Sequence, residues 1–264
     1  MAEYTAIQLT IENDVAWLTM NRPDARNAVN DEMREELIAV LTDARTNPAI
    51  RAVVLTGAGK GFCTGADLSK RGSGGPVGPG AAREMMRTRS QRLIRTLWEL
   101  EKPVIAAVNG VAAGVGAHLA FFCDLIIASA DARFIEVFVR RGLAIDGGGA
   151  YLLPRLIGLA KAKELVFFGD DLSADEALRI GLVNKVVPAD GLHAAAKEWA
   201  ERLASGPTFA LGMSKRLLNR SLESDFETSL DEEAMMVSIV TTSEDTKEGI
   251  ASFMERRPPV FKGR

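Results

Sequence analysis

Apolar residues near the start of the chain recur with the two-residue period of a β-strand. The alternation covers residues 7–11, stops at a polar turn and resumes over residues 15–19, which predicts a β-hairpin. Between residues 33 and 44 the period becomes that of an amphipathic helix. Asn30 stands where that helix would be capped, and residues 47–48 (NP) would end it.

Three continuous apolar runs follow, each short enough for a strand that is buried on both faces. They cover residues 51–56, 103–108 and 124–130, and helical patterns separate the first two. Residues 173–176 (SADE) form a capping box, which predicts a short helix that ends at Gly181. Strands that alternate with helices predict an α/β fold.

The last part of the chain has the pattern of helices alone. We expect helices at roughly 191–204, 207–222, 226–242 and 245–256. We therefore divide the chain into an α/β core, residues 1–200, and a C-terminal helical region, residues 201–264. A helical region after such a core could be a lid or an assembly surface.

Composition and charge exclude several classes of function. The chain has 264 residues, 47% of them hydrophobic, which is enough for one large or two modest domains. A net charge of −3 gives no broad attraction to nucleic acid or to an anionic membrane. No apolar run approaches the roughly 20 residues of a membrane span. The N-terminus lacks the layout of a signal peptide and there are two cysteines, so we expect a cytoplasmic protein without disulfides.

Two glycine-marked turns are the strongest candidates for a chemical site. They lie within residues 55–68 and 103–118, and each follows an apolar run. Glycine lets the backbone approach a ligand closely, and the N–H groups left free at such turns can point at one oxygen. Two converging N–H donors stabilise the negative charge that forms in acyl transfer or enolate formation. A third glycine run, residues 146–149 (DGGG), begins with the carboxylate of Asp146.

At these residues the chain resembles the crotonase family, which is also called the enoyl-CoA hydratase/isomerase family. The matching segments, in the order of the family, are residues 21–23 (NRP), 27–28 (NA), 63–68 (CTGADL), 102–110 (KPVIAAVNG), 123–125 (CDL) and 181–188 (GLVNKVVP). The resemblance implies a spiral of ββα turns and a C-terminal helical region that builds a homotrimer, or a hexamer of two trimers. It also implies acyl-CoA thioester substrates, with coenzyme A as part of the substrate and no separate cofactor.

The resemblance implies that the backbone N–H groups of Ala66 and Val115 hold the thioester oxygen. Most members of the family have glycine where Val115 stands. Because the donor is a main-chain group, it survives this change as long as the turn keeps its dihedral angles. Gly114 and Gly116, on either side, favour that outcome.

Both carboxylates of the family's hydratases are missing from the matching positions, which hold His118 and Phe138. Glu136 is close to the second position, but on a strand it would differ from Phe138 by a full period. Asp146 matches the acid/base aspartate of a subgroup that includes ring-epoxide isomerases of the phenylacetyl-CoA pathway and some enoyl-CoA isomerases. One carboxylate can take a proton from one carbon and return it to another, so isomerisation is favoured over hydration.

Alternatives remain at this stage for the polar candidates. Asp146 could be a turn residue or helix cap, or a nucleophile as in the family's aryl-CoA dehalogenases, which carry tryptophan where Phe138 stands. His118 could be a neutral polar group of the site or a buried histidine that shapes the pocket. The chain could also be a hydratase in which Glu136, His118 or Asp146 supplies the missing groups, or an acyl-CoA binding protein without activity.

The resemblance assigns the other substrate contacts to the path of coenzyme A and to the acyl end of the site. The residues concerned are Arg26, Ala28, Ala66, Asp67 and Leu68 along the path, Gly114, Val115 and Phe138 at the acyl end, and Phe253 and Lys262 from a neighbouring subunit. Residues 70–80 are rich in glycine and proline and predict a loop. With two histidines and two distant cysteines, we expect no metal site.

Overall fold

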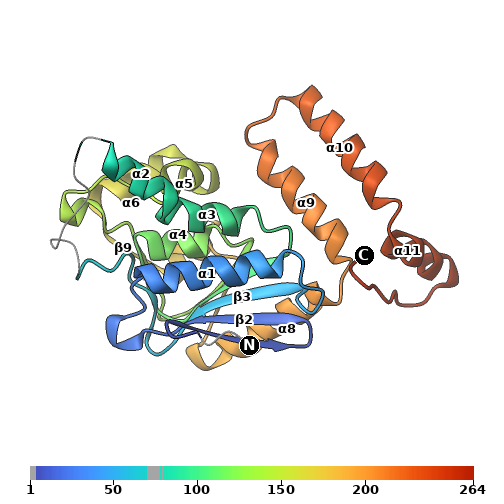
Figure 1. The fold of residues 1–264 in the computed structure, drawn as a ribbon, viewed down its shortest axis with the longest axis horizontal. Helices are drawn as coiled ribbons and strands as arrows, with labels where there is room; N and C mark the ends of the chain where they lie inside the picture. Colours follow the sequence, from blue (N-terminus) through green and yellow to red (C-terminus); the bar gives the residue numbers. More distant parts are fainter. Residues whose placement is uncertain (1–3, 70–77, 79) are drawn as a thin grey trace.

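Two sheets, both mainly parallel, form the centre of the molecule in the computed structural model, which describes residues 4–69, 78 and 80–264 (Figure 1). The larger sheet contains, in spatial order, β1 (Ile7–Glu12), β2 (Val15–Met20), β3 (Ala52–Gly57), β5 (Val104–Val108), β7 (Leu125–Ser129) and β10 (Lys185–Val187). The smaller sheet contains β4 (Gly61–Cys63), β6 (Val111–Ala113), β8 (Arg133–Ile135) and β9 (Asp171–Ser173). The loop expected at residues 70–80 lies almost wholly outside the described residues.

From β3 to β8, successive strands alternate between the two sheets. β3, β5 and β7 lie in the larger sheet, and each is followed by a three-residue strand, β4, β6 or β8, in the smaller one. β4, β6 and β8 are parallel neighbours, so their carboxyl ends lie at one edge of the smaller sheet. The α/β class and the repeating strand–strand path agree with the expected spiral, and β1 and β2 form the predicted antiparallel hairpin.

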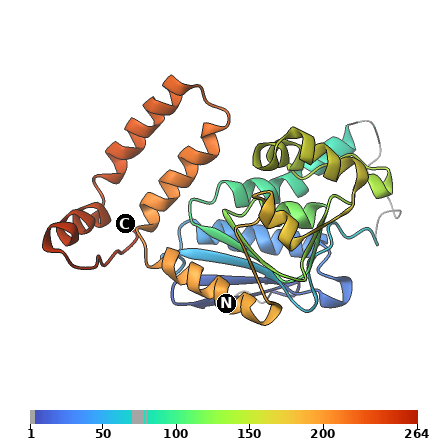
Figure 2. The same cartoon turned by 180° about the vertical axis from the view of Figure 1, so that it is seen from behind.

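Helices cover both faces of the larger sheet (Figures 1 and 2). The α-helices that begin in the first two hundred residues are α1 (Asp31–Ala44), α2 (Ala81–Thr88), α3 (Ser90–Trp98), α4 (Val115–Phe121), α5 (Gly149–Ile157), α6 (Leu159–Phe168), α7 (Ala174–Arg179) and α8 (Leu192–Ala204). The last of them, α8, extends past residue 200. α1 and α3 share one buried cluster with the sheet, and α8 shares a second cluster on the opposite face. The domain boundary near residue 200 stays a prediction, since α8 continues the core up to Ala204.

Local sequence signals explain where several helices begin. The Asn30 side chain accepts a hydrogen bond from the Met33 amide at 2.9 Å, so it caps α1 as predicted. The Ser173 hydroxyl accepts one from the Glu176 amide at the start of α7. α5 and α6 were not evident from the pattern, because a glycine run precedes α5 and Pro154 lies inside it.

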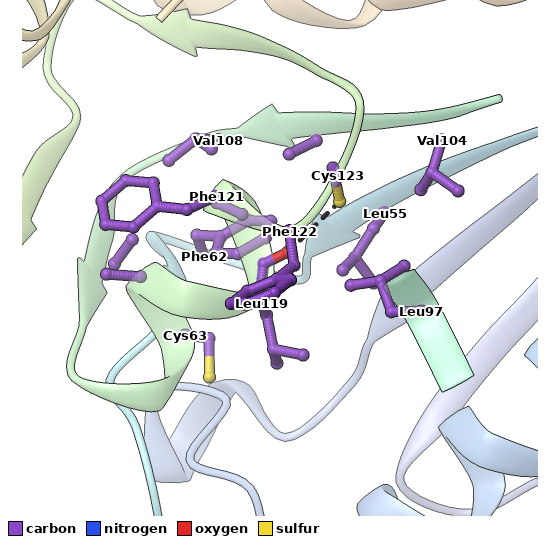
Figure 3. Packing of buried hydrophobic residues seen from close by; sticks show 14 of the residues in the cluster. Leu55, Phe62, Cys63, Leu97, Val104, Val108, Leu119, Phe121, Phe122 and Cys123 are labelled. Atoms are coloured by element: carbon purple, nitrogen blue, oxygen red, sulfur yellow. Dashed lines mark hydrogen bonds between the residues drawn. The ribbon is translucent and has the colours of Figure 1, made fainter. Parts of the chain in front are cut away.

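The helix α4 is the most deeply buried of the short helices, and it fixes the second glycine turn. All seven of its residues are buried. Figure 3 shows its residue Leu119 packed close to Leu55 of β3 and Leu97 of α3. The turn that leads into α4 is therefore anchored in the core of the protein.

The C-terminal helices α9 (Thr208–Ser221), α10 (Phe226–Val240) and α11 (Glu244–Glu255) agree closely with the expected segments and extend away from the core (Figure 1). Every residue of α10 is at least partly exposed, including Met235 at 60% and Val237 at 58%. Such a surface fits an assembly region. Across the described ranges, every helix is too short or too polar to cross a bilayer.

Candidate active site

The two glycine turns lie directly against each other at the edge of the smaller sheet. Gly65 follows β4 and Gly114 follows β6, its parallel neighbour. A Cβ atom on Gly65 would lie 2.9 Å from the Ala113 carbonyl oxygen and 3.9 Å from the Val115 nitrogen. One on Gly116 would lie 2.2 Å from the Cys63 carbonyl oxygen. Only glycine fits at both positions, and this close approach brings the Ala66 and Val115 backbones together.

The backbone pairing of Ala66 directs its N–H group into this region. Val29 N–H donates to the Gly65 carbonyl at 2.8 Å, and Asp67 N–H donates to the Val29 carbonyl at 2.9 Å. In this parallel bridge the Ala66 N–H must point away from Val29. Within the described residues, neither Ala66 N–H nor Val115 N–H donates a hydrogen bond inside the chain. Neither donor thus has a partner among the described residues, which is a condition that the expected oxyanion site has to meet.

Two asparagine side chains hold the first turn in shape. Asn109 Nδ2 lies 2.9 Å from the carbonyl oxygen of Gly57 and 3.0 Å from that of Gly59. Asn27 Nδ2 lies 2.8 Å from the Gly61 carbonyl oxygen, and its side chain is fully buried. Both asparagines stand in segments that resemble the family, but no role was expected for them. Their position beside glycine turns could have indicated this role, because asparagine side chains often form hydrogen bonds to backbone groups in turns.

The third glycine run brings Asp146 to the same end of α4. Gly147 and Gly148 have left-handed backbones, with φ of 56° and 81°. A Cβ on Gly147 would lie 3.2 Å from Cγ2 of Val115 and 3.2 Å from Nδ1 of His118. Asp146, which immediately precedes Gly147, is partly exposed. Its loop thus packs on the turn that carries the second N–H donor.

His118, Glu136 and Phe138 are brought together in the interior of the protein. His118 is fully buried, and its ring stacks on Phe138 with centroids 5.5 Å apart. His118 Nε2 lies 3.1 Å from both carboxylate oxygens of Glu136. The structure has no strand at residues 136–138. β8 ends at Ile135 and Phe138 has helical backbone angles, and the side chains of Glu136 and Phe138 both contact the His118 ring.

The residues expected along the path of coenzyme A form one continuous surface. Arg22 Nη1 donates to the Ala28 carbonyl at 2.6 Å and pairs with Asp67 at 2.9 Å. The Arg26 carbonyl accepts from the Thr64 amide at 3.2 Å. Segments 26–28 and 64–67 are thus neighbours joined by hydrogen bonds. Leu68 follows them and is 38% exposed. Hydrogen bonds from Ser69, then from Arg22, lower the pKa of Asp67 to about 2.

Phe253 and Lys262 are not brought to this region by their own chain. Phe253 lies on α11 and is 81% exposed. Lys262 lies in the tail beyond α11, where its ammonium group is 3.4 Å from Glu244. α11 belongs to the helical region that projects from the core, whereas the tail that carries Lys262 returns to the base of that region, where Arg51 bonds to the Phe261 carbonyl (Figure 1). Their expected contact with coenzyme A therefore depends on a second copy of the chain.

The two thiols are poor candidates for chemistry. Both are buried, and burial raises the pKa of the Cys63 thiol to about 12. Burial raises the pKa of Cys123 as well. Both therefore remain protonated and unreactive at neutral pH. Among the residues that the structure describes, no three His, Cys, Asp or Glu side chains gather as a metal would require, and the absence of a metal stays a prediction.

Comparison with known proteins identifies the family of the chain. The family model described as enoyl-CoA hydratase/isomerase matches residues 10–264. The chain is 41% identical over 255 residues to the 1,2-epoxyphenylacetyl-CoA isomerase of Escherichia coli K12, covering 96% of this chain and 97% of that protein. It is 40% identical over 256 residues to the short-chain-enoyl-CoA hydratase of Clostridium acetobutylicum, covering 97% of each.

Solved structures support the same relationship. The crystal structure of an enoyl-CoA hydratase/isomerase from Cupriavidus metallidurans matches with a TM-score of 0.93 at 36% identity, over 100% of this chain and 98% of that one. The fold is therefore the crotonase type that the sequence motifs imply, with its C-terminal helical region. The chain belongs to the enoyl-CoA hydratase/isomerase family of enzymes.

Proposed function

We propose that the protein is an acyl-CoA isomerase that moves a double bond or a proton through a thioester enolate. The family implies an acyl-CoA thioester as the substrate. The observation that carries the isomerase assignment is the set of polar groups around the two N–H donors. The two positions of the paired hydratase glutamates hold His118 and Phe138, whereas Asp146 stands on a loop that contacts Val115.

In this mechanism the thioester carbonyl oxygen accepts hydrogen bonds from the Ala66 and Val115 N–H groups. The Asp146 carboxylate takes a proton from a carbon of the acyl group, and the electron pair moves toward the thioester to form the enolate. The same carboxyl group then returns the proton to another carbon, so nothing is gained or lost. Each N–H donor contributes about 10²–10³-fold to the rate, and the acid/base group about 10²–10⁴-fold.

Replacing Asp146 by asparagine tests the assignment. Asp146→Asn keeps the shape of the side chain and removes its basicity, so we expect kcat on 3-enoyl-CoA esters to fall by at least about 10²-fold. KM should change little, because the N–H donors remain. The exposed Asp131→Asn variant, an identical change elsewhere on the surface, serves as the control. Full isomerase activity in Asp146→Asn would refute the proposal.

Hydration is the second candidate, because several relatives are named as hydratases, the Clostridium acetobutylicum protein among them. The buried pair of His118 and Glu136 would then have to supply a group that activates water. The same substrate panel separates the two activities. Rapid conversion of 2-enoyl-CoA to its 3-hydroxy product would favour hydration, and tight binding with no turnover on the whole panel would indicate a binding protein.

We also propose that the chain assembles into a trimer, or a hexamer of two trimers, through the C-terminal helices. The proposal is supported by the exposed apolar side chains of this region, among them Phe226 at 73%, Ile250 at 63% and Met254 at 76%. Exposed apolar surface of this extent indicates an interface. In such an assembly Phe253 and Lys262 could approach coenzyme A on a neighbouring subunit.

A further inference from the structure

Two ionisable side chains are buried behind the proposed site, and the proposed chemistry uses neither of them. His118 is 0% exposed and Glu136 is 4% exposed. His118 Nε2 lies 3.1 Å from each carboxylate oxygen of Glu136. Burying such groups is costly unless they are paired with good geometry. A pair of this kind, next to a reactive loop, needs an explanation beyond packing.

The imidazole ring of His118 is the surface on which the Asp146 loop rests. A Cβ on Gly149 would lie 2.3 Å from both Cε1 and Nε2 of the ring, and one on Gly147 would lie 3.2 Å from Nδ1. On the ring, Phe138 stacks at an interplanar angle of 24°. The loop can therefore adopt its path only because residues 147 and 149 lack side chains, and its position depends on the orientation of the ring.

Glu136 determines that orientation. A carboxylate oxygen accepts a hydrogen bond from a ring N–H, so the contact with Glu136 can anchor the His118 tautomer that carries its hydrogen on Nε2. The other ring nitrogen, Nδ1, is buried and has no hydrogen-bond partner among the described residues. The contact with Glu136 is thus the one polar anchor that the structure provides for the ring within the described part of the chain. Without it, the imidazole could change its tautomer or rotate.

We propose that Glu136 is a positioning residue that acts through His118. Glu136 fixes the imidazole, and the imidazole fixes the loop at residues 146–149, so that Asp146 keeps its distance from the bound thioester. The inference rests on the proposed role of Asp146 as the acid/base. It also accounts for the two residues that replace the hydratase glutamates, because His118 and Phe138 together form the support of the loop.

The variant Glu136→Leu tests the proposal directly. It removes the carboxylate that anchors the ring and puts an apolar side chain in its place. Misplacing a reacting group by about 1 Å can cost about 10²-fold in rate, so we expect kcat on a 3-enoyl-CoA ester to fall by about 10–10²-fold. KM should stay within about threefold, because the N–H donors that bind the thioester are unchanged. Glu136→Gln keeps an oxygen that can accept from Nε2, and its kcat should remain within about fivefold of the parent.

A second variant keeps the test decisive if Glu136→Leu does not fold. Gly149→Ala inserts a methyl group against the ring and displaces the loop from its support. It should lower kcat without raising KM. Asp171→Asn is the matched control. Asp171 pairs with Ile135 in the sheet next to Glu136, and among the described residues its side chain forms an exposed ion pair with Arg140 alone. Its kcat should be unchanged.

The outcomes separate this inference from the proposed function. If Asp146→Asn is inactive but Glu136→Leu or Gly149→Ala folds with the parent kcat, the positioning role is refuted and the function stands. If Asp146→Asn is fully active, the proposed function fails first. A purely structural role would lower the thermal midpoint of Glu136→Leu and leave kcat per folded active site unchanged, which also refutes the inference.

Discussion

At the scale of single residues, hydrogen bonds between side chains fix the segments around the candidate site. Asp67 illustrates this, since it accepts hydrogen bonds from the Ser69 hydroxyl at 2.6 Å and from Arg22 at 2.9 Å. Arg22 in turn binds the Ala28 carbonyl. One carboxylate therefore ties together the two segments that are expected to contact coenzyme A.

The Asp67 carboxylate should stabilise the fold in a pH-dependent way. Its pKa is lowered from 3.8 to about 2, so the folded state favours the ionised form. The stabilisation is complete above about pH 4 and is lost as the pH falls toward 2. The difference in unfolding free energy between the parent and Asp67→Asn should therefore shrink across that range in denaturant titrations. A difference that does not change with pH would contradict this assignment.

Residue identity alone could predict part of the site. Ala66, Val115 and Asp146 stand in glycine-marked motifs whose local chemistry is visible in the sequence. The proposed role of Glu136 could not be predicted, because its contact with His118 joins two segments that are 18 positions apart in the chain. β8 ends at Ile135, whose carbonyl accepts from Gly114 N–H at 2.9 Å, so only the tertiary structure brings Glu136 next to α4.

At the scale of elements, the longest were the most predictable. The hairpin, α1 and the C-terminal helices span enough residues for a period to repeat, and they match the expected segments. The strands β4, β6, β8 and β9 have three residues each, too few to show any period. These short strands are the ones that position the site, so its geometry emerges only from the tertiary structure.

The turn between β3 and β4 should depend on Asn109. Asn109→Ala removes the hydrogen bonds to the carbonyl oxygens of Gly57 and Gly59. Leaving these groups without a partner should cost about 1–3 kcal/mol in the free energy of unfolding. It should also lower kcat, because the turn orients the Ala66 N–H group. The measurements are denaturant unfolding and steady-state kinetics.

Asn184→Ala is the matched control for that prediction. Asn184 also bonds to the backbone, accepting from the Ile126 amide at 2.7 Å, but it lies at the β7 and β10 side of the larger sheet. The Asn184→Ala variant should be less stable than the parent protein and have the same kcat. Equal losses of kcat in both variants would show that the Asn109 effect is a general loss of stability.

At the scale of the whole molecule, a few polar contacts attach the C-terminal helices to the core. Lys215 on α9 pairs with Asp124 at 2.8 Å, next to β7. Arg51 donates to the Gly206 and Phe261 carbonyls, at 2.7 and 3.2 Å. The apolar side chains of α10 face outward instead. The helical region is thus joined to the core at its base and presents most of its apolar surface to something else.

Assembly should therefore depend on α10. Light scattering of the parent protein should give a mass three or six times the 28.4 kDa of the chain. The double variant Met235→Lys with Val237→Lys places charge on exposed apolar positions and should shift the mass toward smaller species. Glu233→Lys, an equally drastic change at an exposed polar position of the same helix, should leave the mass unchanged. A monomeric parent protein would exclude the proposed assembly.

The side chain of Val115 has a consequence for redesign of the substrate range. The proposed hydrogen bond to the thioester comes from the backbone N–H group of residue 115. The side chain at this position can therefore change without removing the donor. The freedom has a limit, because Cγ2 of Val115 would lie only 3.2 Å from a Cβ at residue 147. A bulkier residue at 115 has to be accepted together with glycine at 147. New acyl specificities should thus arise through changes at residue 115 while residue 147 stays glycine.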